Sequence, residues 1–428
     1  MNAGFVKAIA LINSGYSAFI TGRAGTGKTT FIDLIRENCR DRNFAVVAPT
    51  GIAALNAKGQ TIHSFFRLPF GVVDARDINV DPYREELYKR LDLLIIDEVS
   101  MVRADILDGI DYVLRRSRKR KDVLFGGVQV ILVGDLFQLP PVVEQSLIKY
   151  FDISYGGPYF FMASCYQKFG GVQTIELTKI YRQSDSKFIN LLGRMCKNSM
   201  SDADLDIVNS RVIQLVSKEV ESDYIVLSTT NKIAEEVNQR FLRELKTPEF
   251  KYIAQVMGVF DDGSYPTDHD LILKQGAKVM FIRNDQERRW VNGTIGRISN
   301  LVDNRVFVVI GDTEHEVLKE TWNKIDYDIS YDKSKPGLAQ NVKGTFTQYP
   351  LRLAWAVTIH KGQGKTFDKI FIMPGNGMFA HGQAYVALSR ARSLSGVVLK
   401  SPLRRRDVIF DKRIYGIVPG DSEYEELI

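Results

Sequence analysis

The sequence predicts an α/β fold built from two units, each a parallel sheet covered by helices. Over roughly the first 160 residues, short apolar segments alternate with helical stretches, which is the pattern of a parallel sheet. A glycine-rich loop joins the first of these segments to a helix. A second alternation begins near residue 172, is interrupted from about residue 247 by a stretch with a period of two, and resumes after residue 344.

Apolar runs bounded by polar or glycine-rich turns mark the strands of the first unit. Residues 67–81 break the alternation, and with Pro69, Gly71 and a valine-rich middle they are expected to form a small hairpin insertion. The helix after the glycine-rich loop is expected over residues 28–38. The expected strands are residues 17–21, 44–48, 93–96 and 128–133.

The second unit contains an insertion with a different periodicity. Residues 278–283, 294–301 and 305–310 are expected to be antiparallel strands, and Asn292-Gly293 is a strong signal for a tight hairpin turn. Around this insertion, strands are expected at 173–177, 224–228, 351–358 and 369–373, and helices at 186–196, 231–245, after Gly362, and at 384–391.

The composition indicates the broad class of protein but does not identify its function. The 428 residues are 45% hydrophobic and 25% charged, as in a globular chain, and no apolar run reaches the length of a membrane span. Three scattered cysteines and the lack of a targeting segment indicate a reduced, cytoplasmic compartment. The net charge of +6 only weakly favours a polyanionic partner. The basic run at residues 115–121 is either a solvated helix end or a nucleic-acid contact.

Residues 22–30 read GRAGTGKTT and match the phosphate-binding pattern G-x-x-x-x-G-K-[ST]. Glycines let backbone N–H groups turn toward phosphate oxygens, and the helix that begins there points its positive end at the same anion. In this pattern Lys28 binds the β- and γ-phosphates and the Thr29 hydroxyl binds Mg²⁺. The residues expected to hold the triphosphate are Gly22, Gly25, Thr26, Gly27, Lys28, Thr29 and Thr30.

Polar side chains follow two further apolar strands. Asp97 and Glu98 end the segment LLIIDE, where Asp97 is expected to bind Mg²⁺ and Glu98 to orient and deprotonate the attacking water. Such residues suit the carboxyl end of a strand, because ligands bind there in open α/β sheets. Gln138, in GDLFQLPP, stands past the next strand and either senses the γ-phosphate or belongs to a turn stiffened by two prolines.

Taken together, the motifs resemble those of a superfamily-one DNA helicase, and their order is most similar to the petite-integration-frequency family in the RecD-like branch. The resemblance covers about residues 15–400. It rests on the phosphate loop and on the segments APTG (48–51), TIHSF (61–65), DE (97–98), GDLFQLPP (134–141), YRQ (181–183), AVTIHKGQG (356–364) and YVALSRAR (385–392). In addition, residues 178–194 are similar to the signature that separates this family from RecD.

The resemblance implies two RecA-like domains with ATP between them and single-stranded DNA across their top. It implies residues 1–172 as domain 1A with a wedge at 66–82, residues 173–294 and 344–420 as domain 2A, and residues 295–343 as an SH3-like β-barrel insertion. It makes Gln138 the γ-phosphate sensor and Arg182 and Arg390 the arginine fingers, and it brings the Gly364 backbone to the γ-phosphate. The chain would then be a bare helicase core of the bacterial or phage type.

The same resemblance implies the DNA contacts, for which short hydroxyls and backbone N–H groups are suited. His63 is alternatively a buried structural histidine, and His360 alternatively links DNA to the ATP cleft. Phe65, Phe66, Pro69 and Phe70 would cover the end base pair of a duplex, or else belong to the core. The residues expected to line the strand are Pro49, Thr50, Gly51, His63, Ser64, Arg67, Thr358, His360 and Lys361.

The expected function is an ATP- and Mg²⁺-dependent 5′-to-3′ DNA helicase, with single-stranded, duplex and forked DNA as partners. The polarity, an activity on G-quadruplexes and RNA–DNA hybrids, and a monomeric state come from the resemblance alone. Helicases of this kind often carry a glutamine before the phosphate loop that recognises adenine. No glutamine precedes Gln60 here, so how adenine is recognised is open. Alternatives are an ATP-gated clamp on single-stranded nucleic acid, an RNA helicase, or a small-molecule kinase.

Overall fold

The computed structural model describes residues 2–69, 71–169, 172–183, 185–213, 223–302, 304–330 and 337–417. Its α/β class confirms the expected one. Contacts within the chain divide it into two units: residues up to 181 with 323–344 and those from 411 on, and residues 182–322 with 345–410. Residues 323–344 thus belong to the first unit by their contacts. The finer division into four domains remains a proposal.

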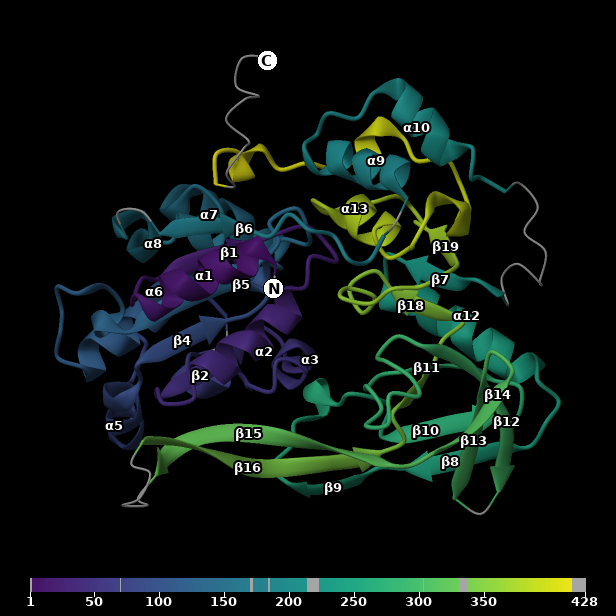
Figure 1. Ribbon diagram of the computed structural model, residues 1–428, viewed down its shortest axis with the longest axis horizontal. Helices are drawn as coiled ribbons and strands as arrows, with labels where there is room; N and C mark the ends of the chain where they lie inside the picture. The colour runs from purple at the N-terminus through teal and green to yellow at the C-terminus, as the bar shows by residue number, and fades with distance from the viewer. Residues whose placement is uncertain are drawn as a thin grey trace. The chain divides into compact units, whose positions relative to one another are not determined.

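The first unit is built on a parallel sheet. Its strands are β1 (Ala18–Thr21), β2 (Phe44–Ala48), β3 (Gln60–Thr61), β4 (Leu93–Ile96), β5 (Gln129–Gly134) and β6 (Gln173–Glu176). They lie in the order β3-β2-β4-β5-β1-β6, and every neighbouring pair is parallel (Figure 1). All residues of β1, β4 and β5 are buried, which explains why these strands read as unbroken apolar runs.

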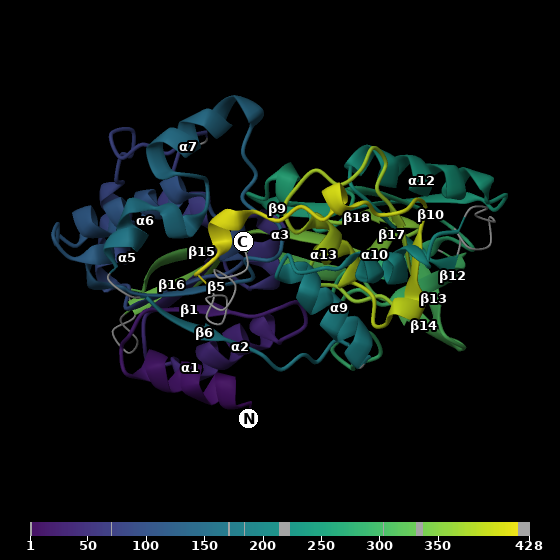
Figure 2. The same ribbon diagram turned by 90° about the horizontal axis from the view of Figure 1, so that it is seen from above.

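Helices cover both faces of this sheet. They are α1 (Ala3–Asn13), α2 (Lys28–Asn38), α3 (Gly51–Asn56), α4 (Ile62–Phe66), α5 (Pro82–Arg90), α6 (Ala104–Ser117), α7 (Ile148–Tyr155) and α8 (Ser164–Lys168). Figure 2 shows α1 and α2 on one side of the sheet and α5, α6 and α7 on the other. On the first side, the rings of Phe5 and Phe31 lie 5.2 Å apart in a cluster with the apolar residues of β1, β2, β4 and β5.

The expected hairpin at residues 67–81 is wrong for the described part of that segment. Residues 67–69 and 71–81 form turns without a strand, and they pack against α6. The Val73 N–H donates to the Asp105 carboxylate at 2.7 Å, and the side chains of Val73 and Ile78 close over Gly109. Contacts to a helix therefore replace the cross-strand pairing that the valines suggested.

Two of the aromatic residues considered for a wedge, Phe65 and Phe66, belong to the core. Phe65 and Phe66 are buried and pack edge-to-face on each other, and both contact Tyr88 of α5. Phe70 lies outside the described residues. Of the two readings that the sequence left open for Phe65 and Phe66, core packing is the one observed.

An arm of two long strands completes the first unit. It consists of β15 (Glu320–Ser330) and β16 (Gly337–Gln348), which Figure 1 shows side by side, and the short strand β9 (Gln255–Gly258) extends their sheet in the order β15-β16-β9. Tyr327 of the arm is buried, its ring lies 5.2 Å from that of Phe65, and its hydroxyl accepts the Val46 N–H at 2.9 Å. The arm thus covers the aromatic cluster of the first unit.

A buried ion pair fixes the arm beside Tyr327. Arg84 of α5, which is 4% exposed, donates to both carboxylate oxygens of Asp326 at 2.6 and 2.8 Å and to the Tyr327 carbonyl at 2.6 Å. Gln60 and Lys343 also donate to Asp326, at 3.0 and 3.1 Å. The carboxylate of Asp326 is the common acceptor that joins β3, α5 and both strands of the arm.

We expect Asp326→Ala to destabilise the first unit by about 3 kcal/mol, because it leaves the Arg84 guanidinium buried without its carboxylate. The double variant Arg84→Met/Asp326→Leu should recover most of this loss. Unfolding in guanidinium chloride, followed by far-ultraviolet circular dichroism, measures this loss of stability. Tryptophan fluorescence would report on the other unit, because Trp290, Trp322 and Trp355 all lie in the second unit. The matched control, Asp74→Ala, removes an exposed partner of Arg76 and should change nothing measurable; equal behaviour of the two would contradict the role of Asp326.

The second unit has its own parallel sheet. Its strands are β7 (Ile225–Ser228), β18 (Ala356–Thr358), β19 (Ile370–Met373) and β20 (Val397–Leu399), in the order β18-β7-β19-β20. Its helices are α9 (Ser186–Cys196), α10 (Asp202–Asn209), α12 (Asn231–Glu244) and α13 (Gln383–Leu388). Every strand pair in this sheet is parallel, as expected for the second alternation of the sequence.

Antiparallel strands form the inserted part of the second unit. They are β8 (Glu249–Ile253), β9 (Gln255–Gly258), β10 (Asp270–Lys274), β11 (Lys278–Phe281), β12 (Ile295–Val302), β13 (Arg305–Ile310), β14 (Thr313–Val317) and β17 (Leu351–Leu353). Five of them make an antiparallel sheet in the order β14-β13-β12-β11-β17, β10 pairs with β8 in antiparallel register, and β9 lies beside β16. The period of two after residue 247 is thereby explained, while the SH3-like form of the barrel remains a prediction.

Two expectations for the second unit were wrong. The strand expected at 351–358 is two short strands, β17 and β18, which belong to different sheets. The helix expected after Gly362 is a series of turns, in which the N–H groups of Gly362 and Lys365 donate to the carbonyls of Thr358 and Gly362. Gly364 has φ of +79°, a left-handed conformation that interrupts a helix. Within the described ranges, no helix has the length and apolar character needed to cross a membrane.

Candidate functional site

The glycine-rich loop of the first unit joins β1 to α2 in the geometry that an anion requires. Gly25 and Gly27 have φ of +83° and +87°, a region in which glycine is favoured. A Cβ on Gly22 would lie 2.7 Å from both the Leu177 carbonyl oxygen and Thr26 Oγ1, so only glycine fits there. Thr29 and Thr30 lie exposed in the first turn of α2, whose N-terminus is the positive end of the helix.

Lys28 is held against its own loop. Its Nζ donates to the Gly22 carbonyl at 2.6 Å and to the Arg23 carbonyl at 3.3 Å, and it lies 3.9 Å from Asp135 Oδ2. Thr26 Oγ1 donates to the same Arg23 carbonyl at 2.9 Å. The ammonium group is therefore positioned at the loop by main-chain oxygens and one carboxylate.

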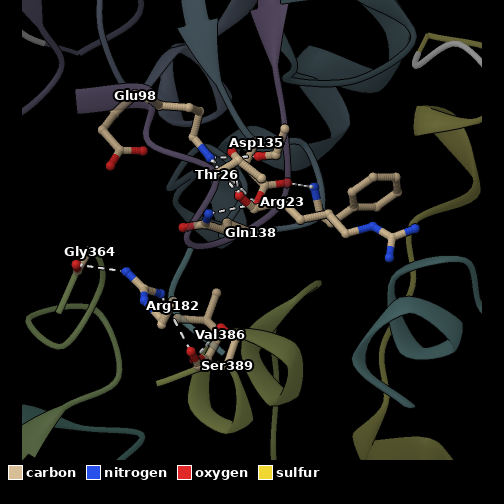
Figure 3. A network of polar contacts seen from close by, with 12 residues as sticks. Arg23, Thr26, Glu98, Asp135, Gln138, Arg182, Gly364, Val386 and Ser389 are labelled. Atoms are coloured by element: carbon tan, nitrogen blue, oxygen red, sulfur yellow. Dashed lines mark hydrogen bonds and ion pairs between the residues drawn. The ribbon is translucent and has the colours of Figure 1, made fainter. Parts of the chain in front are cut away.

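Asp135 also holds the candidate sensor Gln138 (Figure 3). The Gln138 Nε2 donates to Asp135 Oδ2 at 2.6 Å, and both side chains are buried. The N–H groups of Phe137 and Gln138 donate to Asp135 Oδ1 and the Asp135 carbonyl, which fixes the turn after β5. The same carboxylate oxygen, Asp135 Oδ2, thus contacts both Lys28 and Gln138.

Asp97 and Glu98 follow β4 at the same edge of the sheet. The Asp97 N–H donates to the Val47 carbonyl, and Asp97 Oδ1 accepts the Glu98 N–H at 2.9 Å. Burial, followed by the neighbouring charge of Glu98, raises the pKa of Asp97 to about 7. Glu98 has φ of +49°, an unfavourable conformation for a residue with a Cβ, and such conformations are common at functional sites.

The strand order brings these groups together within the first unit. Strands β4, β5 and β1 are neighbours, and their carboxyl ends carry Asp97 and Glu98, Asp135 and Gln138, and the phosphate loop. Ligands bind at this edge in open α/β sheets. The half-buried Asp97 carboxylate and the exposed Thr29 hydroxyl are hard oxygen ligands of the kind that Mg²⁺ prefers, so the donor set fits this ion.

The candidate arginines of the second unit lie around one loop, residues 361–365. Arg182 donates from Nη2 to the Gly364 carbonyl at 2.8 Å and from Nη1 to the Ser389 carbonyl at 3.4 Å, as Figure 3 shows. Gln183, which is buried, donates to the carbonyls of Ser389 and Ala391. The segment YRQ is therefore joined to the end of α13, although the two are about 200 residues apart in sequence.

Arg390 is 0% exposed and is bonded within its own unit. Its Nε donates to the Val386 carbonyl at 2.8 Å and its Nη2 to Ser389 Oγ at 2.7 Å. Its Nη1 lies 3.4 and 3.3 Å from the carbonyls of Gly362 and Lys365. The structure thus brings Arg182, Arg390 and Gly364 together, and it shows Arg390 fixing the loop from within.

The DNA-contact candidates of the first unit follow two paired strands. β2 and β3 are parallel, with Ala48 opposite Thr61, so the turns that follow them are neighbours. The Thr50 hydroxyl caps α3 by accepting the Ala53 N–H at 3.2 Å, and Ser64 Oγ accepts Gln60 Nε2 at 2.7 Å. Pro49 and Gly51 flank the first turn, and Arg67 ends α4 in an exposed, left-handed conformation.

His63 is half-buried in the second of these turns. Burial, and next the charge of Arg103, lowers the pKa of His63, so its imidazole is neutral near pH 7. A neutral ring contacts a phosphate as a hydrogen-bond donor rather than as a cation.

The candidates of the second unit follow β18. Thr358 is buried and its Oγ1 accepts the Lys361 N–H at 3.2 Å, so its hydroxyl shapes the turn that leads into residues 361–365. Burial lowers the pKa of both His360 and Lys361. Within this unit, Thr358, His360 and Lys361 therefore lie in the same segment as the carbonyls that hold Arg182 and Arg390.

Sequence reasoning did not assign several of the residues that organise these sites. Asp135 stands in the motif GDLFQLPP three residues before Gln138, and its place directly after an apolar strand was the available signal. Gln183 follows Arg182 and anchors it to α13. The carboxylate of Asp326, more than 240 residues from Arg84, gave no local signal.

The parallel sheet with its phosphate loop, the two carboxylates after β4 and the Asp135–Gln138 pair together define a P-loop nucleoside triphosphatase. Residues 4–203 match the family described as PIF1-like helicase. The ATP-dependent DNA helicase Pif1 of Bdellovibrio bacteriovorus is 31% identical over 422 residues, spanning 95% of this chain and 89% of that protein. The chain belongs to the PIF1-like helicase family.

Solved structures of Pif1 from Bacteroides sp agree with this assignment. The complex with ADP-AlF4 is 36% identical, covers 99% of this chain and 97% of that chain, and has a TM-score of 0.90. The complex with single-stranded DNA is also 36% identical, with 99% and 97% covered and a TM-score of 0.68. These Pif1 proteins bind, respectively, a nucleotide analogue and single-stranded DNA.

Proposed function

We propose that this chain hydrolyses ATP to move along single-stranded DNA in the 5′-to-3′ direction and to unwind duplex DNA. As a PIF1-like helicase it is an ATP-dependent DNA helicase. The observation that carries the proposal is the Lys28–Asp135–Gln138 network, because it joins the phosphate loop to a buried amide that can sense the γ-phosphate. A chain that only bound nucleotide would not need such a connection.

We propose that the residues divide the hydrolysis between them. Lys28 neutralises the β- and γ-phosphates, and Glu98 takes the proton from the water that attacks the γ-phosphorus while the bond to the bridging oxygen of ADP breaks. Arg182 and Arg390 stabilise the charge that spreads over the transferred group. Thr29 and Asp97 would hold Mg²⁺, which would supply neutralisation of the phosphate charge.

We propose that the turns after β2 and β3 and the segment after β18 hold the DNA strand. Their groups are hydroxyls, main-chain N–H groups and basic side chains, which bind phosphates and carry no sequence information. Movement then follows if ATP binding and release change the grip of each unit. G-quadruplexes and RNA–DNA hybrids as further substrates, and a monomeric state, belong to the same proposal by family resemblance.

The test is strand displacement on duplexes that carry only a 5′ or only a 3′ single-stranded tail. We expect ATP-dependent displacement with the 5′ tail alone. A motor that moves 5′-to-3′ along a 5′ tail travels toward the duplex, whereas on a 3′ tail it travels away from it. Glu98→Gln is the matched control, since it keeps the size of the side chain but cannot accept a proton; it should bind ATP and DNA without displacing the strand. Displacement only from 3′ tails would contradict the polarity.

The rival functions give different results in the same assay. A non-enzymatic, ATP-gated clamp would bind single-stranded nucleic acid without hydrolysing ATP and without displacing a strand from either substrate. An RNA helicase would prefer tails of RNA over DNA. A small-molecule kinase would hydrolyse ATP at a rate that single-stranded DNA does not raise.

A further inference from the structure

Three basic side chains of the second unit lie together: Arg352 of β17 and Lys361 and Lys365 of the loop after β18. Met280 of β11 is the cross-strand partner of Arg352, so their side chains stand on the same face of the sheet. The Lys365 Nζ lies 3.7 Å from Met280 Sδ. Lys365 and Arg352 therefore converge on the same methionine, and Lys361 lies one turn away in the same loop.

These cations have few acceptors. Among the described residues, Arg352 Nε is buried without a hydrogen-bond acceptor, and Arg352 Nη2 donates to the Tyr265 carbonyl at 3.4 Å. The thioether of Met280 is a weak acceptor for Lys365. In the described part of the chain, none of the three forms an ion pair, although the charges of Asp268 and Glu235 act on the cluster from a greater distance.

The cluster is unfavourable as it stands. Burial, and then the charges of Arg352 and Lys361, lowers the pKa of Lys365 to about 7. Burial lowers the pKa of Lys361, and Arg352 lowers it further. Like charges that are partly removed from water repel each other strongly, and an anion among them relieves both the repulsion and the unmet hydrogen bonds.

We propose that Arg352, Lys361 and Lys365 form a binding site for one phosphate of the single-stranded DNA backbone. The assignment of DNA as the ligand rests on the proposed function. An arginine with a free Nε and two lysines offer several charged donors to one phosphodiester, which is the group that such donors bind best. Neither Arg352 nor Lys365 was assigned a role by the motifs of the sequence.

The position of the loop gives this site a second consequence. The carbonyls of Gly362, Gly364 and Lys365 accept hydrogen bonds from Arg182 and Arg390, while the side chains of Lys361 and Lys365 belong to the cation cluster. A phosphate bound by the lysines therefore acts on the same loop that holds the two arginines. Through this loop, bound DNA would adjust the arginines that act on ATP.

The experiment compares Lys365→Met and Arg352→Gln with wild type. The dissociation constant of a labelled oligothymidine is measured without nucleotide at several salt concentrations. We expect each variant to bind about tenfold more weakly, in line with the loss of a charge-assisted hydrogen bond. The slope of log affinity against log salt should fall by about 0.7, the value for one phosphate of a single strand. Lys400→Met removes an exposed lysine of the same unit and serves as the charge-matched control.

A folding defect is distinguished by the melting temperature. Lys365→Met keeps the length of the side chain and removes a repelled charge, so its melting temperature should equal or exceed that of wild type while DNA affinity falls. A second arm uses oligothymidines with one neutral methylphosphonate linkage. Wild type should lose affinity at a particular linkage, and Lys365→Met should lose much less there.

Three other outcomes would contradict the proposal. If ADP binding weakens in the variants while oligothymidine binding does not, the cluster binds a nucleotide phosphate and the proposal is wrong. If the variants bind DNA as the Lys400→Met control does, the site is also wrong, although the helicase function stands. A wild-type chain that hydrolyses ATP but does not bind oligothymidine overturns both.

Discussion

Lys28→Ala is expected to lose ATP hydrolysis by at least about a hundredfold and to lose strand displacement completely. The Lys28 ammonium is held at the loop by the Gly22 carbonyl and by Asp135, so the substitution removes a cation that the loop itself positions. Removing one preorganised electrostatic group from a phosphoryl-transfer site costs roughly 10²–10³ in rate. The measurement is the steady-state rate of phosphate release with saturating single-stranded DNA, alongside displacement of a 5′-tailed duplex.

The control for this variant is Lys58→Ala. Lys58 is an exposed lysine of the same unit that lies 3.7 Å from Asp33, and its loss should leave both activities intact. DNA binding by Lys28→Ala should stay close to that of wild type, because the groups proposed for DNA follow other strands. A Lys28→Ala protein that still unwinds DNA would refute ATP hydrolysis as the source of movement.

Arg182→Ala is expected to lower the DNA-stimulated turnover number by about 10³–10⁵-fold, the range for arginines that stabilise the transferred phosphoryl group. Its guanidinium is placed by the carbonyls of Gly364 and Ser389 and by the adjacent Gln183, which is itself anchored to α13. Arg182→Lys should recover little, because an ammonium cannot reproduce the planar, forked donors. Stopped-flow detection of phosphate release measures both variants.

Two results separate a catalytic arginine from a structural one. ATP affinity of Arg182→Ala should change only a few-fold, since Lys28 and its loop are untouched. Arg406→Ala, an exposed arginine of the same unit, should match wild type. A loss of less than tenfold in Arg182→Ala would assign Arg182 to the support of the loop and leave the catalytic role to another group.

Sequence reasoning predicted best where one segment contained the whole signal. The helix at residues 28–38 and the strands at 44–48 and 93–96 have the expected bounds, because each is a short segment with a strong pattern and a clear end. The phosphate loop was predictable for the same reason. Its glycines, Lys28 and the start of the following helix lie within nine residues, so their spacing already specifies the geometry of the phosphate-binding loop.

The wrong expectations share a physical cause, which is that the deciding partner is distant in sequence. The sequence left Phe65 and Phe66 open between wedge and core, because Tyr327, which packs on Phe65, follows more than 250 residues later. Val73 and Ile78 of the segment 67–81 pack on α6 rather than on a second strand. The sequence does not show that Arg352 and Lys365 both lie beside Met280, because that proximity depends on the pairing of β11 with β17.

The arm has a practical consequence for dissecting the protein. Its strands begin and end in the second unit, yet Tyr327 and Asp326 complete the hydrophobic and ionic contacts of the first. A fragment truncated after residue 181 would expose the aromatic ring of Phe65 to water and leave Arg84 without its anion. Such a fragment should aggregate on expression, so the nucleotide-binding lobe is best studied by point substitution in the intact polypeptide.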